Sequence, residues 1–156
     1  MADYELFSDG ACQPNPGHGG WAFLLRNCSL PGDEVISSGQ EPNTTNNRME
    51  LKAILEGLIY FNSNIKPGSN LAISLDSAYV LNGMQSWCRK WQRNNWIKSD
   101  KKPVLNMDMW QQIIDQIDKI PTIEYNLIKG HSGHIENEIC DRAAVNEIKK
   151  AKDSIS

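Results

Sequence analysis

The chain has 156 residues, of which 40% are apolar and 22% are charged, and its formal net charge is −3. This composition is typical of an ordinary soluble globular protein that can bury a proper core. No run of about 18 apolar residues occurs, which excludes a membrane-spanning helix, and the first residues show no secretory pattern. We therefore expect a single catalytic or binding domain over residues 1–156, in the cytoplasm and without membrane contact.

Positive charge is concentrated in one segment of an otherwise acidic chain. Residues 89–102 hold six Lys or Arg and one Asp, a local charge of +5, whereas the remainder carries a charge of −8. Such a segment is often only a solvated surface. Tryptophans at positions 91 and 96 interrupt the basic residues, and this combination favours a nucleic-acid partner.

Three strands are predicted first, over residues 4–12, 20–26 and 34–39, because apolar runs alternate there with turns rich in Gly, Pro and Asn. They indicate an antiparallel meander. A helical face follows, formed by Leu51, Ile54, Leu55, Leu58 and Ile59. Asn47 is its predicted N-cap, with Glu50 three residues later. The apolar run 71–75 is typical of a strand covered on both faces, and its helical connection predicts a parallel pair.

The second half is predicted to be mainly helical. Helical stretches are expected over 77–83, 84–94 and 105–118, then a strand over 122–129 and a final helix from about 137 to about 150. The polar tail, 151–156, is expected to fray. This order predicts an α/β fold: a mixed five-stranded sheet, with three antiparallel strands and then parallel strands, flanked by helices on both faces. A basic protrusion is expected over about 84–102.

Four carboxylates lie at or beside positions where an uncharged side chain is usual. Asp9 is inside the first strand, Glu50 is near the apolar face of the first long helix, Asp76 ends the buried strand, and Asp141 lies beside core positions of the last helix. Each has a simpler alternative role when it is taken singly. In the same order, these roles are a turn residue, a capping-box residue, a helix cap and a partly solvated helix acid. Together they form a costly cluster unless cations compensate them, and oxygen ligands select Mg²⁺ or Mn²⁺.

Four segments then carry a family resemblance. The segments SDGACQPNPGHGG, TTNNRMEL, LDSAYV and KGHSGHIENEICDRAA resemble, in the same order, the motifs of type 1 ribonuclease H, over about residues 4–150. The basic segment resembles the protrusion of the compact bacterial form. The resemblance implies the ribonuclease H-like fold, with Asp9, Glu50, Asp76 and Asp141 as metal ligands. It also implies that His131 serves in proton transfer or product release.

The family hydrolyses the RNA strand of RNA–DNA hybrids with two divalent ions, leaving 5′-phosphate and 3′-hydroxyl ends, largely without sequence preference. By resemblance, Mg²⁺ is the expected cofactor, with Mn²⁺ as a substitute, and Asp9 bridges the two ions. The implied hybrid-binding residues are Cys12, Asn15, Asn46 and Asn47 at RNA sugars, Thr45 and Asn106 at a DNA phosphate, Trp91 at a deoxyribose, and Arg89, Lys90 and Arg93 on the protrusion. No obligate protein partner is expected, and the predicted state is a monomer.

Two other functions stay open at this stage. A nucleic-acid-binding module with a decayed active site has the same basic segment, although the intact set of acids argues against it. A DNA integrase or junction resolvase of the wider superfamily has similar acids, although the GHSGH segment and the basic protrusion favour ribonuclease H. Cleavage of a labelled hybrid distinguishes all three.

Overall fold

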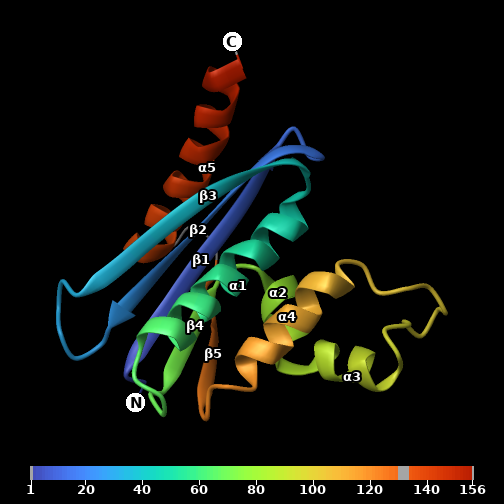
Figure 1. Cartoon of the computed structure of the whole chain (residues 1–156), viewed down its shortest axis with the longest axis horizontal. Helices are drawn as coiled ribbons and strands as arrows, with labels where there is room; N and C mark the ends of the chain where they lie inside the picture. Colours follow the sequence, from blue (N-terminus) through green and yellow to red (C-terminus); the bar gives the residue numbers. More distant parts are fainter. Residues whose placement is uncertain (1, 130–133, 156) are drawn as a thin grey trace.

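A mixed five-stranded sheet forms the centre of the protein (Figure 1). The computed structural model describes residues 2–129 and 134–155. The strands are β1 (Tyr4–Gln13), β2 (Gly17–Asn27), β3 (Glu34–Thr44), β4 (Leu71–Leu75) and β5 (Ile123–Leu127). Strands β1, β2 and β3 pair antiparallel, whereas β4 pairs parallel with both β1 and β5. The strand order β3-β2-β1-β4-β5 confirms the predicted sheet.

Two long helices cover opposite faces of this sheet. Helix α1 (Asn46–Asn64) and helix α5 (Ile135–Ile155) both pack on β1 and β2 (Figure 1). Because side chains alternate along a strand, Leu6 of β1 enters the core beneath α1, while Phe7 packs with Cys140 and Ala144 of α5. Among the described residues, no helix is long and apolar enough to cross a membrane.

The remaining helices build the protrusion and its support. Helix α4 (Met107–Ile117) packs against α1, and α3 (Cys88–Arg93) with the loop after it extends away from the sheet (Figure 1). Helix α2 (Ala78–Asn82) leads into α3 through a π-helical turn, Gly83–Trp87, in place of the expected boundary between two helices. A Cβ on Gly83 would lie 2.1 Å from the Trp110 ring, so glycine lets this turn rest on the core.

Two predictions at helix ends are wrong. The N-cap of α1 is Thr45, not Asn47, because the Thr45 side chain accepts a hydrogen bond of 3.2 Å from the backbone N–H of Arg48. The tail does not fray at 151–155, because α5 continues to Ile155. Ala151 is 5% exposed and extends the buried stripe of Ala144 and Ile148 by another turn.

The contact between α5 and β2 depends on the absence of a side chain at Gly20. A Cβ there would lie 2.0 Å from the backbone oxygen of Ala144. We expect Gly20→Ala to lower the free energy of unfolding by about 1–3 kcal/mol, since the helix has to move away from the strand. Urea titration measures this loss. The control is Gln40→Ala, at the exposed residue of β3 that pairs with Gly20. Its free energy of unfolding is expected to stay within about 0.5 kcal/mol of the wild-type value. Equal stabilities of the two variants would contradict the close approach.

Candidate active site

Asp9 lies in the middle of β1 and is 7% exposed. Its carboxylate Oδ1 accepts a hydrogen bond of 2.9 Å from the backbone N–H of Gly10. The strand interior holds this carboxylate in a fixed position, because β1 pairs with β2 on one side and with β4 on the other. Asp9 therefore has the restricted geometry of a metal ligand, at a position where burial of a charge is costly.

Gly10 brings the first long helix onto Asp9. A Cβ on Gly10 would lie 2.3 Å from the carbonyl carbon of Met49 and 2.4 Å from the nitrogen of Glu50, so only glycine permits this approach. The half-buried Glu50 then reaches β1, where its Oε1 accepts a hydrogen bond of 3.2 Å from the Gly10 N–H. The pair Asp9-Gly10 thus supplies one ligand and the space for a second.

Asp76 completes the group from the neighbouring parallel strand. It follows the last residue of β4, and the register that pairs Phe7 with Ser74 carries it to the level of Asp9. One carboxylate oxygen from each of Asp9, Glu50 and Asp76 lies within 4.8 Å of the others. Asp76 is exposed and accepts a hydrogen bond of 3.4 Å from the Asn137 side chain. This all-oxygen set, open to solvent on the side of Asp76, fits Mg²⁺ or Mn²⁺.

The electrostatics of the group favour a bound proton or a bound cation. Burial raises the pKa of Asp9 to about 7, the negative charges of Asp76 and Asp141 add to the rise, and the hydrogen bond with Glu50 opposes it. Burial also raises the pKa of Glu50 well above its usual range, and the neighbouring Asp9 acts in the same direction. The pair therefore holds a proton more readily than free carboxyl groups do, and a bound cation competes with that proton.

Asp141 and His131 are the other two predicted catalytic residues. Asp141 is exposed on α5 and interacts with Asp9, although it lies outside the group of three oxygens. His131 lies outside the described residues.

The predicted RNA-side residues surround the outer end of β1. Cys12 is buried, and its thiol donates to the backbone oxygens of Thr44, at 3.3 Å, and Pro14, at 3.2 Å. The exposed Asn15 accepts a hydrogen bond of 3.1 Å from the backbone N–H of Asn46. Asn46 and Asn47 are exposed in the first turn of α1. The exposed Asn15, Asn46 and Asn47 form a polar rim, and Cys12 is buried next to it.

A cation joins the two residues predicted to bind a DNA phosphate. Arg48 donates from Nη1 to Oδ1 of Asn106, at 3.1 Å, and forms an ion pair of 2.9 Å with Asp108. Thr45 caps the same helix three residues earlier. Thr45 and Asn106 thus lie on the two helices that Arg48 connects, and they bring a positive charge that the sequence prediction did not include.

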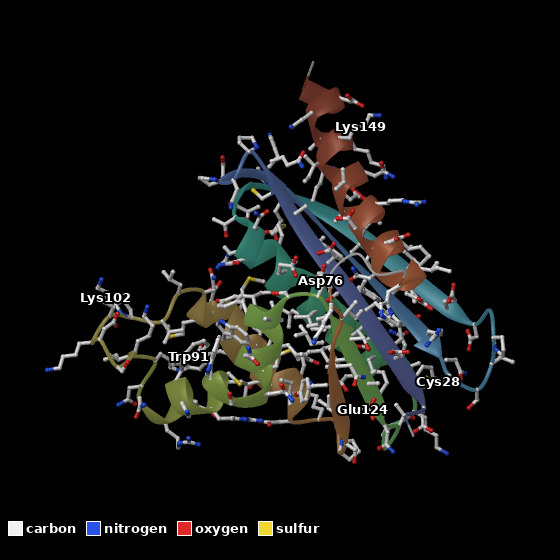
Figure 2. All side chains as sticks on the ribbon, turned by 180° about the vertical axis from the view of Figure 1, so that it is seen from behind. Cys28, Asp76, Trp91, Lys102, Glu124 and Lys149 are labelled. Atoms are coloured by element: carbon white, nitrogen blue, oxygen red, sulfur yellow. The ribbon has the colours of Figure 1, made fainter. Side chains whose placement is uncertain are left out.

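The protrusion combines tryptophan rings in tilted and edge-to-face contact with basic side chains. Trp91 packs between Trp87 and Trp110, with ring centroids 6.1 and 5.5 Å away. A cleft of about 470 Å³ beside it is lined in part by Lys90. Arg89 is engaged by Asp118, which raises its pKa, whereas Lys90 and Arg93 are exposed. In Figure 2, Asp76 lies centrally, with the protrusion to its left and the far end of α5 above it.

Comparison with known proteins supports one family. The RNase H family model matches residues 1–149. A ribonuclease H of Thermoanaerobacter sp. (strain X514) is 44% identical over 147 residues, covering 94% of this chain and 90% of the relative. The chain belongs to the ribonuclease H family. Two solved structures share its fold: LC9-RNase H1, described as a type 1 RNase H with the type 2 active-site motif, and LC11-RNase H1 in complex with an RNA/DNA hybrid.

The two structural similarities are extensive although the sequences differ. LC9-RNase H1 has a TM-score of 0.79 at 24% identity, and the match covers 94% of this chain and 72% of that one. LC11-RNase H1 has a TM-score of 0.72 at 20% identity, covering 95% of this chain and 98% of that one. These values confirm the predicted ribonuclease H-like fold, with its mixed sheet and flanking helices.

Sequence reasoning missed two residues at this ribonuclease H site. Arg48 is part of the TTNNRMEL segment, and its position two residues before Glu50 was a usable signal. Asn137 is 7% exposed and contacts Asp76, but a polar residue near a helix start is usually taken as a cap. Both contacts join residues about 60 positions apart, so local sequence patterns do not reveal them.

The raised pKa of Asp9 gives a stability prediction for the metal-free protein. Because the folded-state pKa is about 7, above the usual 3.8, the folded state binds this proton more tightly than the unfolded state. The stabilising contribution of this proton is complete below the usual pKa of 3.8, and it is lost as pH rises through the folded-state pKa of about 7. We therefore expect the free energy of unfolding of Asp9→Asn, relative to that of wild type, to increase as pH rises between these two pKa values. Urea unfolding with a chelator present measures this difference.

The matched control for this measurement is Asp115→Asn, which removes an exposed acid from α4. Its stability relative to wild type is expected to stay constant over the same pH range. A difference between Asp9→Asn and wild type that does not change with pH would contradict the raised pKa.

Proposed function

We propose that this chain acts as one catalytic domain that hydrolyses the RNA strand of RNA–DNA hybrids at the Asp9–Glu50–Asp76 group. The observation that carries the proposal is the convergence of three carboxylate oxygens within 4.8 Å in a member of the ribonuclease H family. It is further supported by the LC11-RNase H1 structure, which is described as a complex with an RNA/DNA hybrid.

Divalent cations, in the proposal two Mg²⁺ ions, supply an activated water and stabilise the leaving 3′-oxygen when bound, so that the products carry 5′-phosphate and 3′-hydroxyl ends. The chain's own residues hold and orient these groups. Asp9, Glu50 and Asp76 would hold a cation that activates the attacking water, and Asp9 and Asp141 would hold a cation that stabilises the leaving group. His131 is proposed to assist proton transfer or product release.

Hybrid recognition is proposed to use the two ends of the site differently. The polar rim with Cys12, Asn15, Asn46 and Asn47 faces RNA sugars, because the 2′-hydroxyl is both donor and acceptor. Thr45 and Asn106, with the added cation of Arg48, hold a DNA phosphate. Trp91 packs on a deoxyribose. Contacts of these types read the backbone and not the bases, which makes cleavage largely independent of sequence.

The direct test is cleavage of an end-labelled hybrid in Mg²⁺. Loss of an outer partner of a metal ligand already costs about 10–100-fold in activity, so Asp9→Asn and Glu50→Gln are expected to lose more than about 100-fold. Asp115→Asn, at an exposed position of α4, is the control and keeps full activity. A chelator abolishes cleavage in all of them. Binding without cutting by wild type would favour a non-enzymatic module, and cutting of duplex DNA alone would favour an integrase or resolvase.

The protrusion gives a second prediction, on the salt dependence of hybrid binding. Lys90→Met and Arg93→Met are each expected to reduce the slope of log affinity against log salt by about 0.9, the amount for one phosphate contact. Arg89→Met is expected to change the slope less, because Asp118 already engages that guanidinium. Anisotropy titrations between about 50 and 200 mM salt measure the slopes in an Asp9→Asn background.

The control for the salt titrations is Lys149→Met, near the far end of α5 and away from the protrusion (Figure 2). Its slope is expected to equal that of the parent protein. Equal reductions in all four variants would contradict a specific role for the protrusion.

A further inference from the structure

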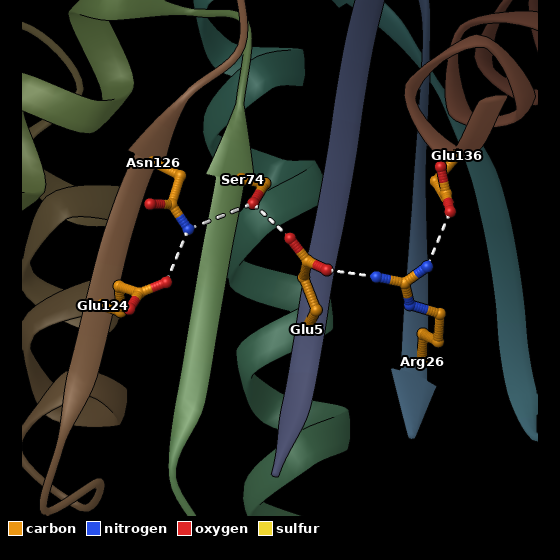
Figure 3. A network of polar contacts seen from close by, with 6 residues as sticks. All are labelled: Glu5, Arg26, Ser74, Glu124, Asn126 and Glu136. Atoms are coloured by element: carbon orange, nitrogen blue, oxygen red, sulfur yellow. Dashed lines mark hydrogen bonds and ion pairs between the residues drawn. The ribbon is translucent and has the colours of Figure 1, made fainter. Parts of the chain in front are cut away.

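A partly exposed ion-pair network lies on the sheet, four residues along β1 from Asp9. Its centre is Arg26 on β2, which pairs with Glu5 of β1. Arg26 donates from Nη1 to Oε1 of Glu136, at 2.8 Å, and pairs through Nη2 with Oε1 of Glu5 (Figure 3). Its guanidinium carbon lies 5.6 Å from the centroid of the Phe7 ring. One cation therefore holds two carboxylates together, one from β1 and one from the first turn of α5.

The network continues across the parallel strands. The second oxygen of Glu5 accepts a hydrogen bond of 2.7 Å from the hydroxyl of Ser74 on β4. Ser74 accepts in turn from the side-chain amide of Asn126 on β5, at 3.5 Å (Figure 3). Glu5 is four residues before Asp9, and Ser74 is two residues before Asp76. The same two strands thus carry the network and lead to two of the clustered acids, Asp9 within β1 and Asp76 directly after β4.

The first turn of α5 touches both groups. Glu136 binds Arg26, and the next residue, Asn137, donates to Oδ2 of Asp76 at 3.4 Å. Asn137 is 7% exposed, and its Oδ1 has no hydrogen-bond partner in the described part of the chain, so the contact with Asp76 fixes this side chain. Asp141 follows one turn later on the same helix. A shift of the first turn therefore moves both Asn137 and Asp141.

We propose that Arg26 is a positioning residue for the metal site, acting through Glu136 on the first turn of α5 and so on Asn137, Asp76 and Asp141. The inference rests on the proposed metal-dependent function. Without the guanidinium, the carboxylates of Glu5 and Glu136 lose the cation that bridges them, and their repulsion displaces the start of α5. Lysine keeps the charge but cannot bond both carboxylates with one planar group.

The exposure of the network separates this role from a purely structural one. The side chain of Arg26 is 35% exposed, and those of Glu5 and Glu136 are 20% and 23% exposed. Ion pairs this open to solvent contribute little to the free energy of unfolding. The expected signature is a large change in metal affinity with a small change in stability.

The experiment measures Mn²⁺ affinity by calorimetry and thermal stability in a chelator for wild type, Arg26→Met, Arg26→Lys and Glu136→Gln. Disturbing an outer partner of a metal site lowers affinity by about 10-fold or more, so that loss is expected for Arg26→Met. Arg26→Lys is expected to recover part of it. The double variant Arg26→Met/Glu136→Gln is expected to bind Mn²⁺ more tightly than Arg26→Met, because the repulsion is removed.

The control is Lys52→Met, which breaks the Lys52–Glu56 pair on α1, whose side chains are 29% and 30% exposed. Its Mn²⁺ affinity is expected to equal that of wild type. Unchanged affinity in a folded Arg26→Met protein would overturn the inference, as would a wild-type affinity of Arg26→Lys if Arg26→Met does not fold. Failure of wild type to bind Mn²⁺ or cleave hybrid would instead refute the proposed function.

Discussion

The mutual repulsion of carboxylates that the fold brings together is the interaction on which the rest of the site depends. The Gly10 N–H and the Asn137 amide, which donate hydrogen bonds to Asp9, Glu50 and Asp76, are neutral groups. Neutral donors reduce the cost of burying these charges but do not cancel it, which is why the pKa of Asp9 rises to about 7. A site of this kind is less stable as a set of free anions, and the binding of a divalent cation relieves the repulsion.

The fold creates this repulsion through a few close backbone approaches. Gly10 lets α1 come near enough for Glu50 to reach β1, and the parallel pairing of β1 with β4 aligns Asp9 with Asp76. Helix α5 adds Asp141 from the opposite layer, and Gly20 allows that helix to lie on β2. The regular elements therefore define the site, while the protrusion, which extends away from the sheet, carries the local excess of positive charge.

Sequence reasoning succeeded where one element carries its own signal. The alternation within residues 4–12 and the helical spacing from Leu51 to Ile59 reflect burial of one face, so the strands and helices could be predicted. It failed at Thr45, because three neighbouring polar residues are all competent caps and only the geometry chooses one. It also missed the networks of Arg26 and Arg48, which join residues far apart in the chain and depend on strand register and helix packing.

The most direct test of the central claim is the number of protons released when the cation binds. Calorimetric titration of the protein with Mn²⁺, in two buffers of different ionisation enthalpy, measures this number near pH 6.5. If converging carboxylates retain a shared proton until a cation replaces it, binding releases about one proton, and Asp9→Asn releases less. Heats that are the same in both buffers across the range where Asp9 titrates would contradict the account.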